Sequence, residues 1–301
     1  MQDKDTALAE VSWLRLMIAA ADIGPQRLGE LLETFESAEA LFESGRRACA
    51  ALTGEEPSRR LFSDETLEQA QSVLHWLQTT PQAGFVSWAD ADFPREALAF
   101  EHAPSILLFR GRRELLKGRR IALAGAARPD REGRQNAASF SAALIREGRS
   151  VVSFLEDETD AEVARAALSA QTGGAAGLIV LSATGPDRLY PSSMRDLFHR
   201  AAQDGLILTP FMPGTGVSED TKQARRVLCA YLCPELLVLQ AELPGPTHAL
   251  ARQFAEYNRD VFVIPGSIHC SLYKGNHKLL REGARLTETV SDITQFGSES
   301  V

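Results

Sequence analysis

The stretch Gly118–Gly133, GRRIALAGAARPDREG, decides the fold class. Its apolar run Ile121–Ala124 stops at Gly125, and a polar loop leads past Gly133 into the helix-like segment RQNAASFSAALIREG. A strand, a glycine, a loop and a helix in this order open a Rossmann-like unit, where backbone N–H groups at the helix start can hold an anion. The full G-x-G-x-x-G spacing is absent and no acidic residue is placed for a ribose, so we reject a dinucleotide site as the first interpretation.

Strand-like apolar runs alternate with amphipathic stretches over the rest of the chain. After Ile121–Ala124 the runs lie at 151–155, 178–181, 206–208, 236–239 and 261–264, with helix-like stretches such as 161–170, 193–203 and 248–257 between them. This alternation predicts an α/β fold with a doubly wound, mostly parallel sheet and helices on both faces. Ligands of such folds bind at the carboxyl ends of the strands, so the loops after these runs are the candidate binding loops.

The N-terminal residues, from 8 to about 80, are predicted to be helical. Apolar residues repeat at helical spacing in 8–21 and in 25–35, and Ser37 or Ser63 can cap later helices. The turn Ile23–Pro25 has the form of a helix-hairpin-helix turn, whose amides can hold a phosphate, or of a plain two-helix corner. We therefore predict a small helical (helix-hairpin-helix or SAM-like) domain over 1–80, connecting strands and turns over 81–120, and a Rossmann-like domain over 121–301.

The composition bounds the classes of function. A chain of 301 residues with 44% hydrophobic residues can bury a sizeable core, but its net charge of −8 means that a nucleic-acid hypothesis needs local basic patches. No apolar run is long enough for a membrane span and no signal-like leader is present, so we expect a cytoplasmic protein without membrane association. The four cysteines form no C-x-x-C pair, and Cys229 and Cys233 are expected to be buried free thiols.

Catalytic and metal chemistry have weak support in the sequence. Ser153, Asp157, Asp160 and Glu162 could cluster, and their oxygens could hold Mg²⁺, but no convergent partner for acid–base work is apparent. We therefore expect a protein that is not an enzyme and that carries no metal and no cofactor. A small-molecule enzyme on the same sheet is kept as a third hypothesis, which needs a ligand to support it.

A series of short motifs runs through the chain in a specific order. It comprises ADIGPQRLGELLETF, DADFP, APSILLFRG, LLKGRRIALAG, DRLYP, MPGTG, VFVIPGSI and GNHKLLREGA. In this order and spacing, from about residue 10 to 294, the chain resembles the DNA-processing protein A family, also called DprA or Smf. The resemblance implies a small helical domain followed by an extended Rossmann-like domain. It also implies binding of single-stranded DNA, loading of a RecA-type recombinase during natural transformation, and a homodimer.

The chain departs from the family pattern at the anion-binding motifs. After the first strand the family carries G-S-R and then T-x-Y-G; Gly125 and Gly133 are kept, while the Ser, Arg, Thr and Tyr positions hold Ala126, Ala127, Asp130 and Glu132. Where the family has S-G-L-A-R-G-I-D, residues 153–160 read SFLEDETD, which keeps Asp160 but loses the glycines and the Arg. In the late G-x-N-x-L-I motif, His277 stands at the Asn position. Glycines and a cation that would receive a phosphate are thus replaced by side chains and carboxylates.

Two hypotheses follow from these departures. In the first, the chain binds single-stranded DNA through a displaced basic set and assists a recombinase. In the second, it is an interaction or scaffold protein of the same fold that has lost the DNA pocket. The candidate DNA-binding residues are Gly125, Arg128, Gly133, Arg134, Arg188, Arg225, Arg226, Lys274, Asn276, His277 and Lys278.

Overall fold

The computed structural model describes residues 2–94 and 103–295, and the chain divides into two compact units. One unit comprises Met1–Phe109 with Gly185–Arg188 and Pro210–Thr215; the other comprises Arg110–Thr184, Leu189–Thr209 and Gly216–Val301. The division expected at residues 80 and 120 stays a prediction. The portions of the expected domains at residue 1, 95–102 and 296–301 lie outside the described residues.

The first unit begins with six helices, as the apolar periodicity predicts. They are α1 (Gln2–Ile23), α2 (Pro25–Phe35), α3 (Ala38–Ser44), α4 (Arg46–Thr53), α5 (Glu55–Leu61) and α6 (Asp64–Thr79), followed by strand β1 (Ala83–Ser87). The boundary between the two units falls within strand β2 (Ile106–Gly111), after Phe109. Both predicted caps are confirmed, since Ser37 accepts the N–H of Ala40 and Ser63 that of Thr66. Gly24, with φ of 87°, lets the chain turn between α1 and α2.

The second unit is built on a parallel sheet. Its strands lie in the order β6-β5-β4-β3-β7-β8-β9, and each neighbouring pair is parallel. The strands are β3 (Arg119–Ala124), β4 (Arg149–Ser153), β5 (Leu178–Leu181), β6 (Leu206–Thr209), β7 (Glu235–Val238), β8 (Asp260–Val263) and β9 (Arg285–Leu286). The strand order runs one way from β3 to β6 and the other way from β7 to β9. The topological switch point therefore lies between β3 and β7, and the predicted fold class is confirmed.

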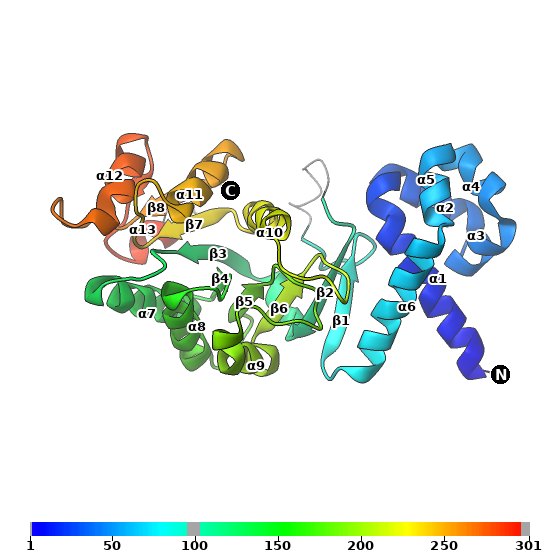
Figure 1. Cartoon of the computed structure of the whole chain (residues 1–301), viewed down its shortest axis with the longest axis horizontal. Helices are drawn as coiled ribbons and strands as arrows, with labels where there is room; N and C mark the ends of the chain where they lie inside the picture. The colour runs from blue at the N-terminus through cyan, green and yellow to red at the C-terminus, as the bar shows by residue number, and fades with distance from the viewer. Residues whose placement is uncertain (1, 95–102, 296–301) are drawn as a thin grey trace. The chain divides into compact units, whose positions relative to one another are not determined.

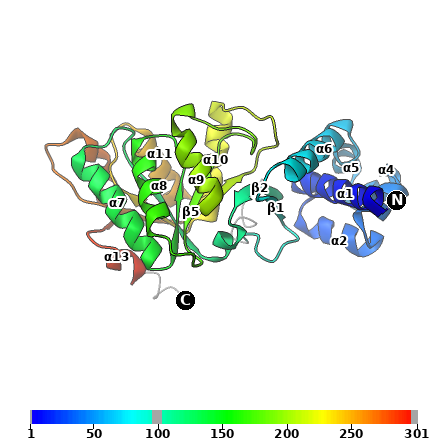
Figure 2. The same ribbon diagram turned by 90° about the horizontal axis from the view of Figure 1, so that it is seen from below.

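Helices cover both faces of this sheet (Figures 1 and 2). The helices α7 (Arg131–Arg146), α8 (Glu158–Ala170) and α9 (Arg195–Asp204) lie on one face, and α10 (Glu219–Leu232), α11 (Pro246–Glu256) and α12 (Lys274–Arg281) lie on the other. Phe140, Leu144 and Val163 pack on Ile121 and Val151 in a buried core beneath α7 and α8. Short 3-10 segments η2 (Arg113–Lys117), η3 (Ser192–Met194) and η4 (Ser271–Tyr273) and the final helix α13 (Ser291–Thr294) complete the described elements.

The expectations about the cysteines and about membrane spans can be compared with the structure. Cys229 and Cys233 are buried and free, as predicted. Over residues 2–94 and 103–295, no helix is both long enough and apolar enough to cross a membrane.

Candidate functional site

The candidate site lies at the carboxyl edge of the parallel sheet, beside the switch point between β3 and β7. The loop after β3 leads through Gly125 and Asp130 into α7, and the loop after β4 leads through Glu156 and Asp157 into α8. The segments after β7 and β8 end at α11 and α12. Rossmann-like folds bind their ligands at this edge. The predicted site residues are therefore compared with the positions that the structure gives them in and around these four connections.

The two glycines of the first loop make room for the chain's own side chains. A Cβ on Gly125 would lie 2.6 Å from the Thr159 methyl group, and the hydroxyl of Thr159 donates to the Ala126 carbonyl over 2.6 Å. A Cβ on Gly133 would overlap the side-chain amide oxygen of Gln240. Internal packing alone therefore requires glycine at both positions, and a direct role in DNA binding stays a prediction.

The N-terminus of α7 holds an internal carboxylate. Asp130 Oδ1 accepts the backbone N–H of Gly133 over 2.8 Å and the side-chain amide of Gln240 over 2.9 Å. A helix N-terminus favours a negative charge because its first N–H groups have no partner within the helix. Asp130 thus occupies the place where the opening of a Rossmann-like unit would receive a phosphate.

The acidic loop after β4 neutralises Arg225. This arginine comes from α10, its side chain is 2% exposed, and its guanidinium donates to Glu156 Oε2 over 2.8 Å. The guanidinium carbon also lies 4.0 Å from the centre of the Phe154 ring, a favourable cation–π arrangement. Phe154 and Glu156 stand where the resembled family has small residues, so the two substitutions enclose the arginine.

Two further carboxyl groups of this loop are shifted towards their neutral forms. Asp160 is buried and accepts the Ser153 hydroxyl over 2.7 Å and the Glu156 N–H over 2.8 Å. Burial nevertheless raises the pKa of Asp160. Burial, assisted by the neighbouring Asp160 carboxylate, raises the pKa of Asp157 to about 8. The loop therefore carries less negative charge near neutral pH than its sequence suggests.

The other predicted cations lie at or near the surface. Arg134 pairs with Glu158 over 2.7 Å, and Lys278 lies 3.8 Å from a carboxylate oxygen of Glu282. Arg128 is exposed and forms no ion pair with the part of the chain that the structure describes. The remaining two donate to neutral groups, Arg226 to Gln223 over 2.8 Å and Lys274 to the Ile268 carbonyl over 2.6 Å.

Two of the segments that carry these residues are brought together. The thiol of Cys270 lies 3.8 Å from Asp130 Oδ2, so the segment before α12 meets the loop that carries Arg128. Arg188 belongs to the other compact unit, and its role in DNA binding stays a prediction.

Asn276 and His277 shape the loops at this edge. Asn276 is fully buried; its Oδ1 accepts the Ala241 N–H over 2.7 Å, and its Nδ2 donates to the carbonyls of Leu239 and Ile264. One ring nitrogen of His277 lies 3.0 Å from the Gly266 carbonyl oxygen. Asn276 joins the ends of β7 and β8, and contact of either side chain with DNA stays a prediction.

The net negative charge of the chain lies almost entirely in residues 1–80. Residues 1–80 contain 14 Asp and Glu against 7 Lys and Arg, a net charge of −7 out of the total of −8. Residues 81–301 contain 26 acidic and 25 basic residues, a net charge of −1. The overall charge is therefore no argument against binding of an anion by the sheet-bearing part. Among the described residues, no group of three or more His, Cys, Asp and Glu side chains is placed to hold a metal ion.

The sequence did not reveal which side chains fill the site. Glu156 and Arg225 are 69 residues apart, and Gln240 meets Asp130 across 110 residues. The acidic string Glu156–Glu158 and the missing glycines indicated an altered pocket, but no local pattern could name the partners.

The fold and this edge define a Rossmann-like protein whose strand-end loops are occupied by its own carboxylates. The family model for DNA recombination-mediator protein A matches residues 84–298, and the chain belongs to that family.

Known relatives agree with this assignment. DNA processing protein DprA of Streptococcus pneumoniae is 30% identical over 204 residues, which are 68% of this chain and 71% of that protein. Protein Smf of Synechocystis is 26% identical over 271 residues, 88% of this chain and 67% of that protein.

Solved structures show the same fold. The X-ray structure of DprA from Streptococcus pneumoniae aligns with a TM-score of 0.71 at 25% identity and covers 93% of this chain and 94% of that one. A structure of DNA processing protein A from Helicobacter pylori, which describes a single-stranded DNA binding mode, aligns with a TM-score of 0.63 at 22% identity. It covers 71% of this chain and 96% of that one.

Proposed function

We propose that this chain is a cytoplasmic, non-enzymatic protein that binds single-stranded DNA as a homodimer and assists a RecA-type recombinase in natural transformation. Membership in the DNA recombination-mediator family carries this proposal, because the match spans residues 84–298 and includes the whole parallel sheet. The nearly balanced charge of residues 81–301 is compatible with a DNA surface on the sheet-bearing part.

The DNA surface we propose consists of exposed cations and does not include the buried Arg225. Arg128 and Arg134 lie at the start of α7 and are exposed, and Lys274 is exposed at the start of α12. The Asp130–Cys270 contact joins these two segments. Arg225 is enclosed by Glu156 and Phe154, so the exposed cations supply the phosphate contacts. Lys278 and Arg226 are further candidates for phosphate contacts.

Fluorescence anisotropy of a labelled single-stranded oligonucleotide tests the proposal at about 50 and 200 mM salt. Binding should weaken steeply with salt, and Arg128→Ala and Lys274→Ala should each reduce the salt slope by about 0.7, the value for one single-strand phosphate contact. Arg200→Ala, an exposed arginine on α9, is the matched control and should leave the slope unchanged. Failure to retain the oligonucleotide at either salt concentration would remove the proposal.

The Glu156–Arg225 pair favours a second candidate function. Because the buried Arg225 is already paired with Glu156, this second candidate is an interaction or scaffold protein of the same family that no longer binds DNA. In that case the same titration shows no binding by the native chain, while binding to a protein partner persists. Tight, salt-sensitive DNA binding rules this alternative out.

A further inference from the structure

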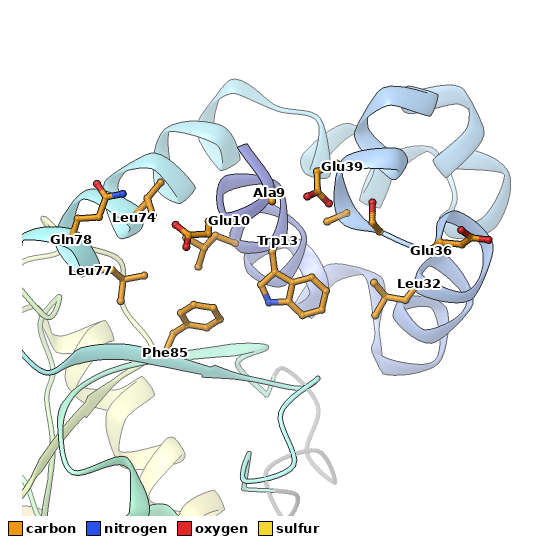
Figure 3. Close-up of a pocket in the computed structure, with 13 residues that line it drawn as sticks. Ala9, Glu10, Trp13, Leu32, Glu36, Glu39, Leu74, Leu77, Gln78 and Phe85 are labelled. Carbon is orange, nitrogen blue, oxygen red and sulfur yellow. The ribbon is translucent and has the colours of Figure 1, made fainter. Parts of the chain in front are cut away.

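The helical unit contains an apolar groove that the DNA proposal does not use (Figure 3). Its volume is about 710 Å³, within the range of roughly 300–1,000 Å³ that is typical of ligand sites. Figure 3 shows the rings of Trp13 from α1 and Phe85 from β1 with the side chains of Leu74 and Leu77 from α6. Leu32 from α2 lines the groove on the other side of the indole. These side chains form a continuous apolar floor, which we call the Trp13 groove.

Carboxylates surround this floor. Glu10, Glu36 and Glu39 line the Trp13 groove, and none of its lining residues is Lys or Arg. Glu36 holds its place with φ of 62°, in the left-handed region that residues other than glycine seldom adopt. Apart from Phe85, the lining residues belong to residues 1–80, which carry nearly all of the net negative charge of the chain. An occupant must therefore combine apolar side chains with positive charge.

We propose that the Trp13 groove docks a helical segment of a partner protein that presents apolar anchors flanked by Lys and Arg. Amphipathic helices bind such grooves by burying apolar residues one turn apart, and the flanking charges steer the encounter. The three glutamates repel phosphates and so disfavour nucleic acid and anionic lipid on this face. The proposal is independent of the proposed DNA binding, because it concerns other residues and ligand chemistry of opposite charge.

Anisotropy with synthetic peptides and the full chain tests the docking site. The probe is a labelled peptide of about 15 residues built from Leu and Lys at helical spacing, and its matched control carries Glu in place of Lys. The Leu/Lys peptide should bind, and the Leu/Glu peptide should not. Trp13→Ala should weaken binding about 30-fold, as expected for a central aromatic anchor. The double variant Glu10→Lys/Glu39→Lys should weaken it about tenfold.

A second charge reversal separates the groove from general acidity. Glu43→Lys/Glu68→Lys changes the charge of the same unit by the same amount at exposed positions outside the groove, and should alter binding less than twofold. Equal weakening by both double variants, or equal binding of both peptides, overturns the proposal.

Two further readouts complete the test. Circular dichroism checks that Trp13→Ala is folded; if it is not, the two charge-reversal variants decide the result alone. Light scattering distinguishes a second copy of this chain as the occupant. Self-association that Glu10→Lys/Glu39→Lys abolishes and that the Leu/Lys peptide does not displace would also overturn the proposal.

Discussion

Replacing Glu156 by Gln tests whether the acidic loop holds Arg225 in its buried place. The substitution keeps the size of the side chain but removes the only carboxylate that forms a salt bridge with this guanidinium among the described residues. Arg225 then remains beside Phe154 with one weaker neutral acceptor. We expect the folded state to lose stability and the arginine to become available to an external phosphate.

The structure sets the size of the effect. Two unit charges about 4 Å apart attract by about 4 kcal/mol at an effective dielectric constant of about 20, and breaking a buried ion pair typically costs about 3–5 kcal/mol. The Glu156 side chain is 23% exposed, and removing its charge also removes part of its desolvation penalty. We therefore expect the free energy of unfolding to fall by about 2–3 kcal/mol. If Arg225 then contacts a phosphate, the salt slope for single-stranded DNA should steepen by about 0.7.

Urea unfolding followed by intrinsic fluorescence measures the stability change, and the oligonucleotide titration measures the slope. The control is Glu158→Gln, which removes the partner of Arg134 two residues further along, where both side chains are about half exposed. Surface pairs are screened by water and salt, so this control should change stability little. Equal unfolding midpoints for the two variants, together with an unchanged salt slope in Glu156→Gln, would refute the reasoning.

Three further changes probe the same edge. The pKa of Asp157 is raised to about 8 in the folded state, so its contribution to stability is full below about pH 4 and is lost as pH rises through about 8. The melting temperature of the native chain should therefore fall over this pH window, and Asp157→Asn should make that fall smaller. Gly125→Ala should cost about 1–3 kcal/mol in urea unfolding, and adding Thr159→Ser should recover part of that loss because it removes the methyl group 2.6 Å from the new Cβ. Asn276→Ala should lower the unfolding free energy by about 3 kcal/mol in calorimetry, since three buried hydrogen bonds are lost at about 1 kcal/mol each; a loss below about 1 kcal/mol contradicts this role.

Much of the fold can be predicted from the sequence because its signals are local. The run Ile121–Ala124 forms the end of β3, and the expected helix at 25–35 has the bounds of α2. The boundaries between the short helices α3, α4 and α5 also have local causes, since Gly45 and Gly54 adopt φ near +90° there. Periodicity and glycine positions report such features directly.

The side-chain partners at the site could not be predicted, because they are set only when distant segments meet. Arg225 has the same helical surroundings in sequence whether it faces solvent or Glu156, and only the packing of α10 against the loop after β4 decides between them. The sequence pattern marks Gly125 and Gly133 as special positions. Glycine is required there because the side chains of Thr159 and Gln240, from distant parts of the sequence, leave no room for a Cβ.

The internal carboxylates also indicate how DNA would have to bind. Glu156 at Arg225 and Asp130 at the start of α7 are tethered to the groups that they neutralise, so their effective concentrations are in the millimolar range or above. A single phosphate at micromolar concentration cannot displace a tethered carboxylate of equal charge. A DNA strand can compensate only through several contacts made at once elsewhere, which is the role we propose for the exposed cations Arg128, Arg134 and Lys274. In this chain, affinity for DNA should therefore depend on strand length more than on any one phosphate pocket.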